Sequence, residues 1–130
     1  MTSVLDASAV LAWVRAEPGA EVVAEYLTSA AISAVNLSEV HRKLTQYGVD
    51  ADRTVMRLRT LGLRVEPVGL DDAVAAARLW PTTRAAGLSL GDRCCLALAA
   101  RLAVPAVTAD GAWSALDVGV AVVAIRPGTS

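Results

Sequence analysis

Short apolar runs alternate with longer stretches of helical periodicity along this chain. Runs of three to six apolar residues bounded by polar residues, Gly or Pro are typical of short buried strands. Their near-continuous apolar character favours a sheet that is covered on both faces. We expect five such strands, at residues 3–5, 30–32, 63–68, 106–108 and 120–125.

Between these runs, apolar residues recur every three to four positions, as on one face of a helix. Asp6 is placed to cap the first helix, and Gly48 and Pro81 are placed to end later ones. The pattern predicts helices at residues 7–14, 20–29, 35–47, 50–62, 70–80 and 89–104.

Strands that alternate with helices predict an α/β fold with a short-stranded, mostly parallel central sheet, because parallel neighbours need crossover connections. The 130 residues suit one domain, and no segment repeats internally. We expect disorder to be limited to a tail at residues 127–130.

Composition narrows the class of protein. Hydrophobic residues make up 55% of the chain and charged residues 19%, which is typical of a globular protein. The formal net charge is −1, so a nucleic-acid partner would have to be held by a local group of arginines. Lys43 is the only lysine and His41 the only histidine.

The two cysteines, Cys94 and Cys95, are adjacent and lie in an apolar helical run. We interpret them as small buried hydrophobic residues in a reducing compartment. No targeting signal or membrane span is recognisable, so we expect a cytoplasmic protein with no membrane association.

Four acids are expected at the edge of the sheet where its strands end, the edge at which such sheets usually bind ligands. Asp6 directly follows the first strand, and Glu39 lies early in the helix after the second. Asp92 lies in the first turn of the helix that Ser89 opens, and Asp110 follows the strand that ends at Thr108. The place of Asp92 assumes that residues 81–88 return the chain to this edge.

Each acid also has a purely structural interpretation. Asp6 can act as an N-cap, Asp110 as the acid of an Asp-Gly turn, and Asp92 as part of a capping box with Ser89. Helical periodicity alone places Glu39 on a solvated face, where it can pair with Lys43.

Taken together, the four acids indicate a metal site. Each close pair of unneutralised carboxylates repels by about 4 kcal/mol at 4 Å and an effective dielectric constant of 20, and a divalent ion removes that cost. Oxygen ligands without a histidine or cysteine cluster favour Mg²⁺ or Mn²⁺ over zinc. Such an ion can activate water for attack on phosphorus, so no histidine base is needed.

Four short motifs, in this order and spacing, resemble those of PIN-domain ribonucleases, specifically the VapC-type toxins of toxin-antitoxin pairs. The motifs are Val4-Leu5-Asp6-Ala7-Ser8-Ala9, Ile32-Ser33-Ala34-Val35-Asn36-Leu37-Ser38-Glu39-Val40, Leu88-Ser89-Leu90-Gly91-Asp92 and Val107-Thr108-Ala109-Asp110. The resemblance covers essentially the whole chain.

This resemblance implies a three-layer α/β/α domain, Mg²⁺-dependent cleavage of RNA, a cognate VapB-like antitoxin and a homodimer. Asp6, Glu39 and Asp92 would be the central metal-binding acids, and Asp110 the fourth, more variable one. Ser8 and Thr108 match the hydroxyl residues that would orient carboxylates or water around the site; as helix-start and strand-end polar residues they also have a structural interpretation.

Two residues depart from the pattern of many relatives. Gly91 and Arg93 flank the third acid where many relatives carry alanine or other small residues, and Arg93 could pair with Asp92 or meet a phosphate. Arg53 and Arg57, one helical turn apart, could contact RNA or form a solvated helix face. We interpret the three tryptophans, Trp13, Trp80 and Trp113, as core or interface residues.

Two other functions are compatible with parts of this pattern. A receiver-like or phosphatase-like domain could use Asp6 as a phosphoryl acceptor, but it needs a lysine near the last strands, and Lys43 lies elsewhere. The other rival is a catalytically silent PIN fold that only binds proteins, which the presence of all four acids disfavours.

Overall fold

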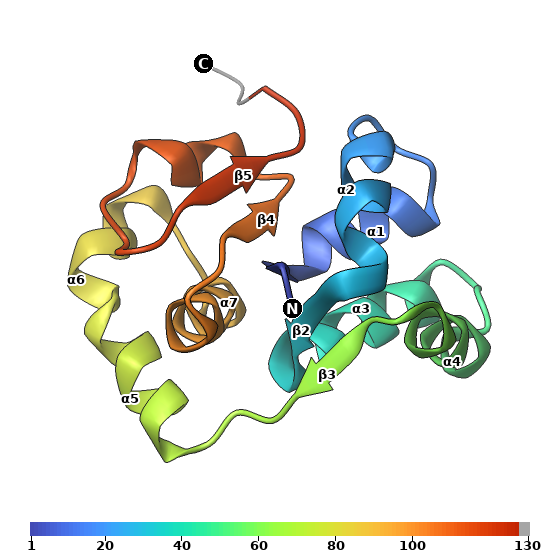
Figure 1. Cartoon of the computed structure of the whole chain (residues 1–130), viewed down its shortest axis with the longest axis horizontal. Helices are drawn as coiled ribbons and strands as arrows, with labels where there is room; N and C mark the ends of the chain where they lie inside the picture. The colour runs from blue at the N-terminus through green and yellow to red at the C-terminus, as the bar shows by residue number, and fades with distance from the viewer. Residues whose placement is uncertain (128–130) are drawn as a thin grey trace.

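The computed structural model describes residues 1–127, so residues 128–130 of the expected flexible tail lie outside the described part (Figure 1). The strands are β1 (Ser3–Leu5), β2 (Ala30–Ser33), β3 (Arg64–Glu66), β4 (Ala106–Thr108) and β5 (Val122–Ala124). The α-helices are α1 (Ala7–Val14), α2 (Ala20–Tyr26), α3 (Ala34–Gln46), α4 (Ala51–Leu61), α5 (Leu70–Arg78), α6 (Trp80–Thr83) and α7 (Leu90–Leu102). Short 3-10 helices are η1 (Leu27–Ser29), η2 (Arg84–Ala86) and η3 (Gly111–Ala115).

The five strands form one sheet in the order β3-β2-β1-β4-β5, and every neighbouring pair is parallel. The expectation of a mostly parallel sheet is therefore confirmed, and within residues 1–127 no strand runs the other way. Because all strands point in one direction, their carboxyl ends share one edge of the sheet.

Side chains of the strands alternate between two hydrophobic cores, as the two-residue period of a strand requires. Leu5, Ile32 and Val107 pack with residues of α1 to α4, whereas Val4 and Ala31 pack with residues of α7. Figure 1 shows the corresponding layers, with α1 to α4 on one side of the sheet and α5 to α7 on the other. The predicted three-layer α/β/α architecture is confirmed.

Side-chain oxygens begin several helices. Asp6, Ser33, Asp50 and Ser89 each accept a hydrogen bond from a backbone N–H in the first turn of α1, α3, α4 or α7. Ser89 and Asp92 form the capping box that the sequence suggested. These four helices thus begin where local side-chain chemistry predicts.

The prediction that Pro81 ends a helix is wrong. The helix α5 already ends at Arg78, and Pro81 lies inside the next short helix, α6. Proline is tolerated in a first helical turn because the N–H groups there have no partner inside the helix. Pro81 therefore helps to start the helix α6, which begins two residues after α5 ends.

Other boundaries differ by a few residues. The second helix gives way to the 3-10 helix η1 after Tyr26, and β3 is shorter than the alternating stretch 63–68 that predicted it. The N–H of Leu63 is used to close α4 by donating to the carbonyl of Leu58, and Pro67 has no N–H to donate to a sheet. The strand β3 therefore cannot extend to Leu63 at one end or to Pro67 at the other.

Cys94 and Cys95 are free thiols and buried, as predicted. Trp113 is a core residue, but Trp80 is half-exposed and stacks under the guanidinium of Arg84. None of the helices within residues 1–127 has the length and apolarity needed to cross a membrane.

Candidate acidic site at the carboxyl edge of the sheet

Asp6 lies at the turn between β1 and α1, and only 3% of its surface is exposed. Its Oδ1 accepts hydrogen bonds from the N–H of Ala9 and from Ser8 Oγ, both at 2.8 Å, and its Oδ2 accepts one from Thr108 Oγ1 at 2.6 Å. These partners are all neutral. Asp6 is therefore an N-cap, as its structural interpretation held, and also a buried carboxylate with no cation bound to it within residues 1–127.

Burial raises the pKa of Asp6 from its ordinary value of 3.8 to about 6. The hydrogen bonds from Thr108, Ala9 and Ser8 act in the opposite direction because they stabilise the ionised form, and the nearby charge of Asp92 raises the pKa further. Desolvation is the largest cause of the raised pKa. A positive ion at this carboxylate would offset the cost of burying its charge.

Ser8 on α1 and Thr108 at the end of β4 link Asp6 to the segment that follows β4. Ser8 Oγ also accepts from the N–H of Ala109 at 2.9 Å, and Thr108 Oγ1 accepts from the N–H of Asp110 at 3.0 Å. Both hydroxyls therefore donate to Asp6 and accept from the β4 loop. This geometry is compatible with the orienting role that the sequence suggested, because each hydroxyl has only one donor hydrogen and it is committed to the carboxylate.

Glu39 lies on α3 against the start of α7. A Cβ at Gly91 would collide with Glu39 Oε1 and lie 2.8 Å from Glu39 Cδ, so the carboxylate is seated directly on the backbone of Gly91. Glu39 is half-buried, and the structure shows no ion pair between it and Lys43 within residues 1–127. The solvated pair that helical periodicity favoured is not found.

Burial raises the pKa of Glu39, and the charge of Asp92 raises it further, whereas Lys43 and Arg42 lower it less strongly. Asp92 thus affects the titration of both Asp6 and Glu39. The three acids come from β1, α3 and α7, and the tertiary structure brings their charges within reach of one another. The return of residues 81–88 to this edge, on which the placement of Asp92 depended, is thereby confirmed.

Asp92 and Asp110 are partly engaged by their own backbones. Asp92 Oδ2 accepts from the N–H of Ser89 at 2.9 Å, and Asp110 Oδ1 accepts from the N–H of Ala112 at 3.0 Å. Asp110 is exposed, and its backbone rather than its carboxylate connects to Thr108. The structural interpretations of these two acids, a capping box for Asp92 and the acid of an Asp-Gly turn for Asp110, therefore hold as well.

The donor set fits a hard divalent cation in chemistry and charge. Asp6, Glu39 and Asp92 offer only carboxylate oxygens, and no ion pair within residues 1–127 neutralises them. As the side chains are placed, however, no three His, Cys, Asp or Glu residues of that range are grouped closely enough to hold one ion. The other oxygen of Asp92, Oδ1, has no hydrogen-bond partner in the described chain and is free to serve as a ligand.

Arg93 turns away from the acids. Its Nη1 donates to the carbonyl of Ala76 on α5 at 3.0 Å, and no ion pair between Arg93 and Asp92 occurs within residues 1–127. The ring of His41 is engaged elsewhere, since its Nε2 lies 2.8 Å from Asp52 Oδ1 and joins α3 to α4. Neither residue supplies a cation to the site.

Sequence reasoning missed Asn36, which is buried between α3 and α7 with 1% of its surface exposed. Its Nδ2 donates to the carbonyl of Gly91 at 3.0 Å, and its Oδ1 accepts from Ser33 Oγ at 2.9 Å. The available signal was an amide at the third position of a helix that begins with serine. Its partner on α7 lies 55 positions away in the sequence, where local pattern gives no indication.

A family profile for the PIN domain matches residues 3–119 of the chain, which includes all four acids. The chain belongs to the PIN domain family. No curated protein sequence gives a significant match. The predicted membership of this family is therefore confirmed by the family profile.

Solved structures share the fold of this PIN domain. A toxin-antitoxin complex from Klebsiella pneumoniae superimposes with a TM-score of 0.78 at 20% identity, over 97% of this chain and 99% of the other. VapC20 of Mycobacterium tuberculosis, described as a sarcin-ricin loop cleaving toxin, gives a TM-score of 0.71 at 20% identity, over 88% and 94%. VapBC2 from Rickettsia felis, bound to a promoter DNA fragment, gives 0.68 at 15% identity, over 94% and 97%.

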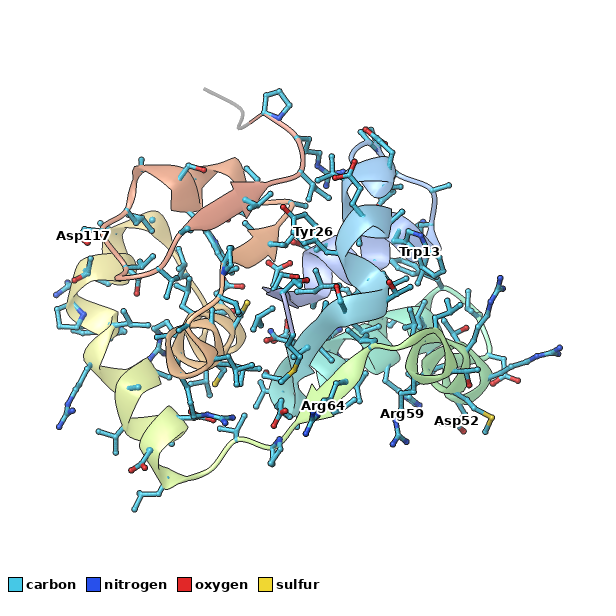
Figure 2. The ribbon with its side chains drawn as sticks, in the orientation of Figure 1. Trp13, Tyr26, Asp52, Arg59, Arg64 and Asp117 are labelled. Atoms are coloured by element: carbon cyan, nitrogen blue, oxygen red, sulfur yellow. The ribbon has the colours of Figure 1, made fainter. Side chains whose placement is uncertain are left out.

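A separate hollow of about 800 Å³ lies between α4 and the edge strand β3 of the PIN domain. Residues Met56, Arg59 and Arg64 line it, and none of the four acids does. Figure 2 shows Asp52, Arg59 and Arg64 on the outer side of these two elements. This surface is chemically distinct from the acidic site, because it combines arginines with exposed apolar side chains such as Met56.

Proposed function

We propose that this PIN-domain chain is a Mg²⁺-dependent endoribonuclease toxin of the VapC type, neutralised by a cognate VapB-like antitoxin. One observation supports it most strongly. The charge of Asp92 raises the pKa of both the buried Asp6 and Glu39, and no cation within residues 1–127 forms an ion pair with any of these three acids. Carboxylates held in this way are stabilised by a divalent ion.

The fold relatives support the same class of activity. VapC20 is described as a toxin that cleaves the sarcin-ricin loop, and the Klebsiella pneumoniae and Rickettsia felis structures are toxin-antitoxin assemblies. At 20% identity or less, these similarities establish only a shared fold. The activity of this chain is therefore proposed from its own acidic residues. The proposed setting is the cytoplasm, where both RNA and an antitoxin are present.

In the proposed mechanism, Asp6, Glu39 and Asp92 would hold Mg²⁺, for which Mn²⁺ could substitute, and Asp110 would contribute from the segment after β4. When bound there, the ion would supply activation of water and neutralisation of charge on the departing oxygen. Ser8 and Thr108 keep the Asp6 carboxylate oriented through their hydrogen bonds. No protein base is required, which agrees with the engagement of His41 by Asp52 on α4.

Binding of RNA and of partners involves other surfaces. Arg53 and Arg57 are exposed on α4 and are our candidates for contacts with RNA phosphates. We propose that the chain forms a homodimer, as the family resemblance implies. We further propose that the antitoxin covers apolar helix surface and inserts a cation between the acids, where it competes with the metal ion.

The experiment that tests this function is cleavage of a mixed RNA pool by purified protein with Mg²⁺ and with EDTA. Asp6→Asn and Asp92→Asn each preserve size and remove one ligand charge, so we expect each to abolish cleavage while the fold persists. Asp117→Asn is the matched control, because Asp117 is exposed and on the far side of the molecule from α4 (Figure 2), and we expect it to cleave like the wild type.

Equal cleavage by the wild type, Asp6→Asn and Asp92→Asn would identify a contaminating nuclease. Binding of a VapB-like antitoxin without any metal-dependent cleavage would instead favour the catalytically silent scaffold. A peptide from such an antitoxin that carries an arginine should weaken Mg²⁺ binding in calorimetry, and failure to do so would refute the proposed competition.

A further inference from the structure

We propose that Asn36 is a positioning residue of the acidic site, which sets the distance between Glu39 and Asp92 by fastening the start of α3 to the start of α7. This inference rests on the proposed function, since it concerns how the metal-binding acids are held. Asn36 touches neither the RNA nor the reacting atoms in this proposal.

Both ends of the Asn36 amide are used, and each end is suited to one partner only. Oδ1 accepts from Ser33 Oγ, and that hydroxyl in turn accepts from the N–H of Asn36 at 3.1 Å. Nδ2 donates to the carbonyl of Gly91 at 3.0 Å. Because the Gly91 carbonyl can only accept, it fixes Nδ2 on that side and leaves Oδ1 to accept from Ser33, so one short side chain serves both partners.

The helix starts of α3 and α7 are built differently for this reason. In α7 the third helical residue, Asp92, bends back to the N–H of Ser89 and completes a capping box. In α3 the third helical residue, Asn36, is secured to the Ser33 hydroxyl and reaches across to Gly91. Among the side-chain hydrogen bonds of residues 1–127, the bond from Asn36 Nδ2 to the Gly91 carbonyl is the one that joins α3 to α7.

The acids lie on either side of this contact. Glu39 follows Asn36 by one helical turn and is seated on Gly91, and Asp92 follows Gly91 directly. A shift of α3 relative to α7 would therefore move Glu39 and Asp92 apart. Such a shift is resisted by the buried hydrogen bond from Asn36 to Gly91, and truncation of Asn36 would also leave the hydrogen of the Ser33 hydroxyl without its acceptor.

The test measures Mn²⁺ affinity by electron paramagnetic resonance, without RNA, in the wild type, Asn36→Ala and Asn36→Leu. Asn36→Leu keeps the size and adds no charge but removes both the donor that faces Gly91 and the acceptor that faces Ser33. We expect both variants to bind Mn²⁺ about 10- to 100-fold more weakly, the range found when groups that support metal ligands are removed.

The matched control is Arg101→Met. Arg101 donates to buried Asp72 at 2.9 Å and 3.1 Å and joins α7 to α5 near the other end of α7. We expect this variant to lose stability, as read from its melting temperature, but to keep wild-type Mn²⁺ affinity. A merely structural role for Asn36 would make Asn36→Ala behave like this control, and that result would overturn the inference.

Cleavage assays add a second readout. For Asn36→Ala we expect the Mg²⁺ concentration at half-maximal rate to rise by the same 10- to 100-fold, the maximal rate at saturating Mg²⁺ to recover, and the KM for RNA to stay unchanged. If the wild type binds Mn²⁺ but cleaves no RNA, the proposed function fails while the affinity comparison still decides the role of Asn36. If the wild type binds no Mn²⁺, both proposals are overturned.

Discussion

Asp6 illustrates how one residue serves the fold and the site at the same time. As an N-cap it satisfies the N–H of Ala9, which stabilises the start of α1. As a buried acid it is costly when ionised, since burial raises its pKa to about 6. The same burial makes it a strong candidate metal ligand, because a divalent ion recovers the lost hydration energy.

Asp6→Asn should stabilise the protein at neutral pH. The pKa of Asp6 is higher in the folded state than its ordinary value of 3.8, so its penalty on stability is absent below pH 4, grows as pH rises toward 6 and is constant above. The shift corresponds to roughly 3 kcal/mol in the free energy of unfolding at pH 7. Urea denaturation in EDTA at pH 4 to 7 would measure it.

Asparagine is also a good N-cap, so α1 should remain intact in this variant. Asp117 is exposed, so the Asp117→Asn variant is the control for the loss of a carboxylate at the surface. A constant difference between Asp6→Asn and the wild type from pH 4 to 7 would contradict the assigned cause of the shift.

At the scale of elements, the close approach of α3 to α7 decides the geometry of the site. Gly91 permits that approach because it has no Cβ, and the Glu39 carboxylate lies in the space where a Cβ would be. Asn36 then fixes the contact from the α3 side. The sequence pattern marked Gly91 only as a departure from relatives, whereas the packing gives it a physical role.

Gly91→Ala should separate stability from activity. Alanine favours a helix interior over glycine by about 1 kcal/mol, so the melting temperature should stay equal or rise slightly. The new Cβ must displace the Glu39 carboxylate, which is the end of a flexible side chain and moves at little cost. We expect Mn²⁺ affinity to fall about tenfold or more, measured by electron paramagnetic resonance.

Gly69→Ala is the control for this prediction. A Cβ at Gly69 meets no atom within 4 Å, and its backbone is extended, so Mn²⁺ affinity should not change. Wild-type affinity in Gly91→Ala would show that Glu39 does not take part in holding the ion.

At the scale of the whole molecule, three remote segments contribute charges of one sign to one edge of the sheet. The bond from Thr108 to Asp6 joins residues 102 positions apart, and the one from Asn36 to Gly91 joins residues 55 apart. The stability of this arrangement must therefore depend on what occupies the acidic site and on whether the acids are ionised.

Mg²⁺ should raise the melting temperature of the wild type, and more strongly at pH 7.5 than at pH 5.5. Below a pKa of about 6 a proton occupies Asp6 and competes with the metal ion. At a concentration 100 times the dissociation constant, binding stabilises the folded state by about 2.7 kcal/mol, which is a shift of several degrees for a domain of this size. Differential scanning calorimetry would record it.

Potassium chloride at the same ionic strength should reproduce none of this shift, and Asp6→Asn should show a reduced shift at pH 7.5. An equal effect of Mg²⁺ at both pH values would indicate binding to acids other than Asp6.

By itself, the sequence determined the features that depend on neighbours within about four residues. Apolar periodicity predicted the alternation of strands and helices, and Asp6 and the Ser89-Asp92 capping box were recognisable as helix starts, because these contacts are local. The expected parallel sheet then followed from the order of elements, and with it the edge at which the acids lie.

Tertiary structure alone decided how those acids are held. The role of Asn36, the seating of Glu39 on Gly91, the turning of Arg93 toward α5 and the raised pKa of Asp6 all depend on segments far apart in sequence. Burial and long-range hydrogen bonds arise only when the helices pack on the sheet, so no local pattern encodes their distances. The boundary at Pro81 also differed from the local prediction, since Pro81 lies in the first turn of α6 and does not end α5.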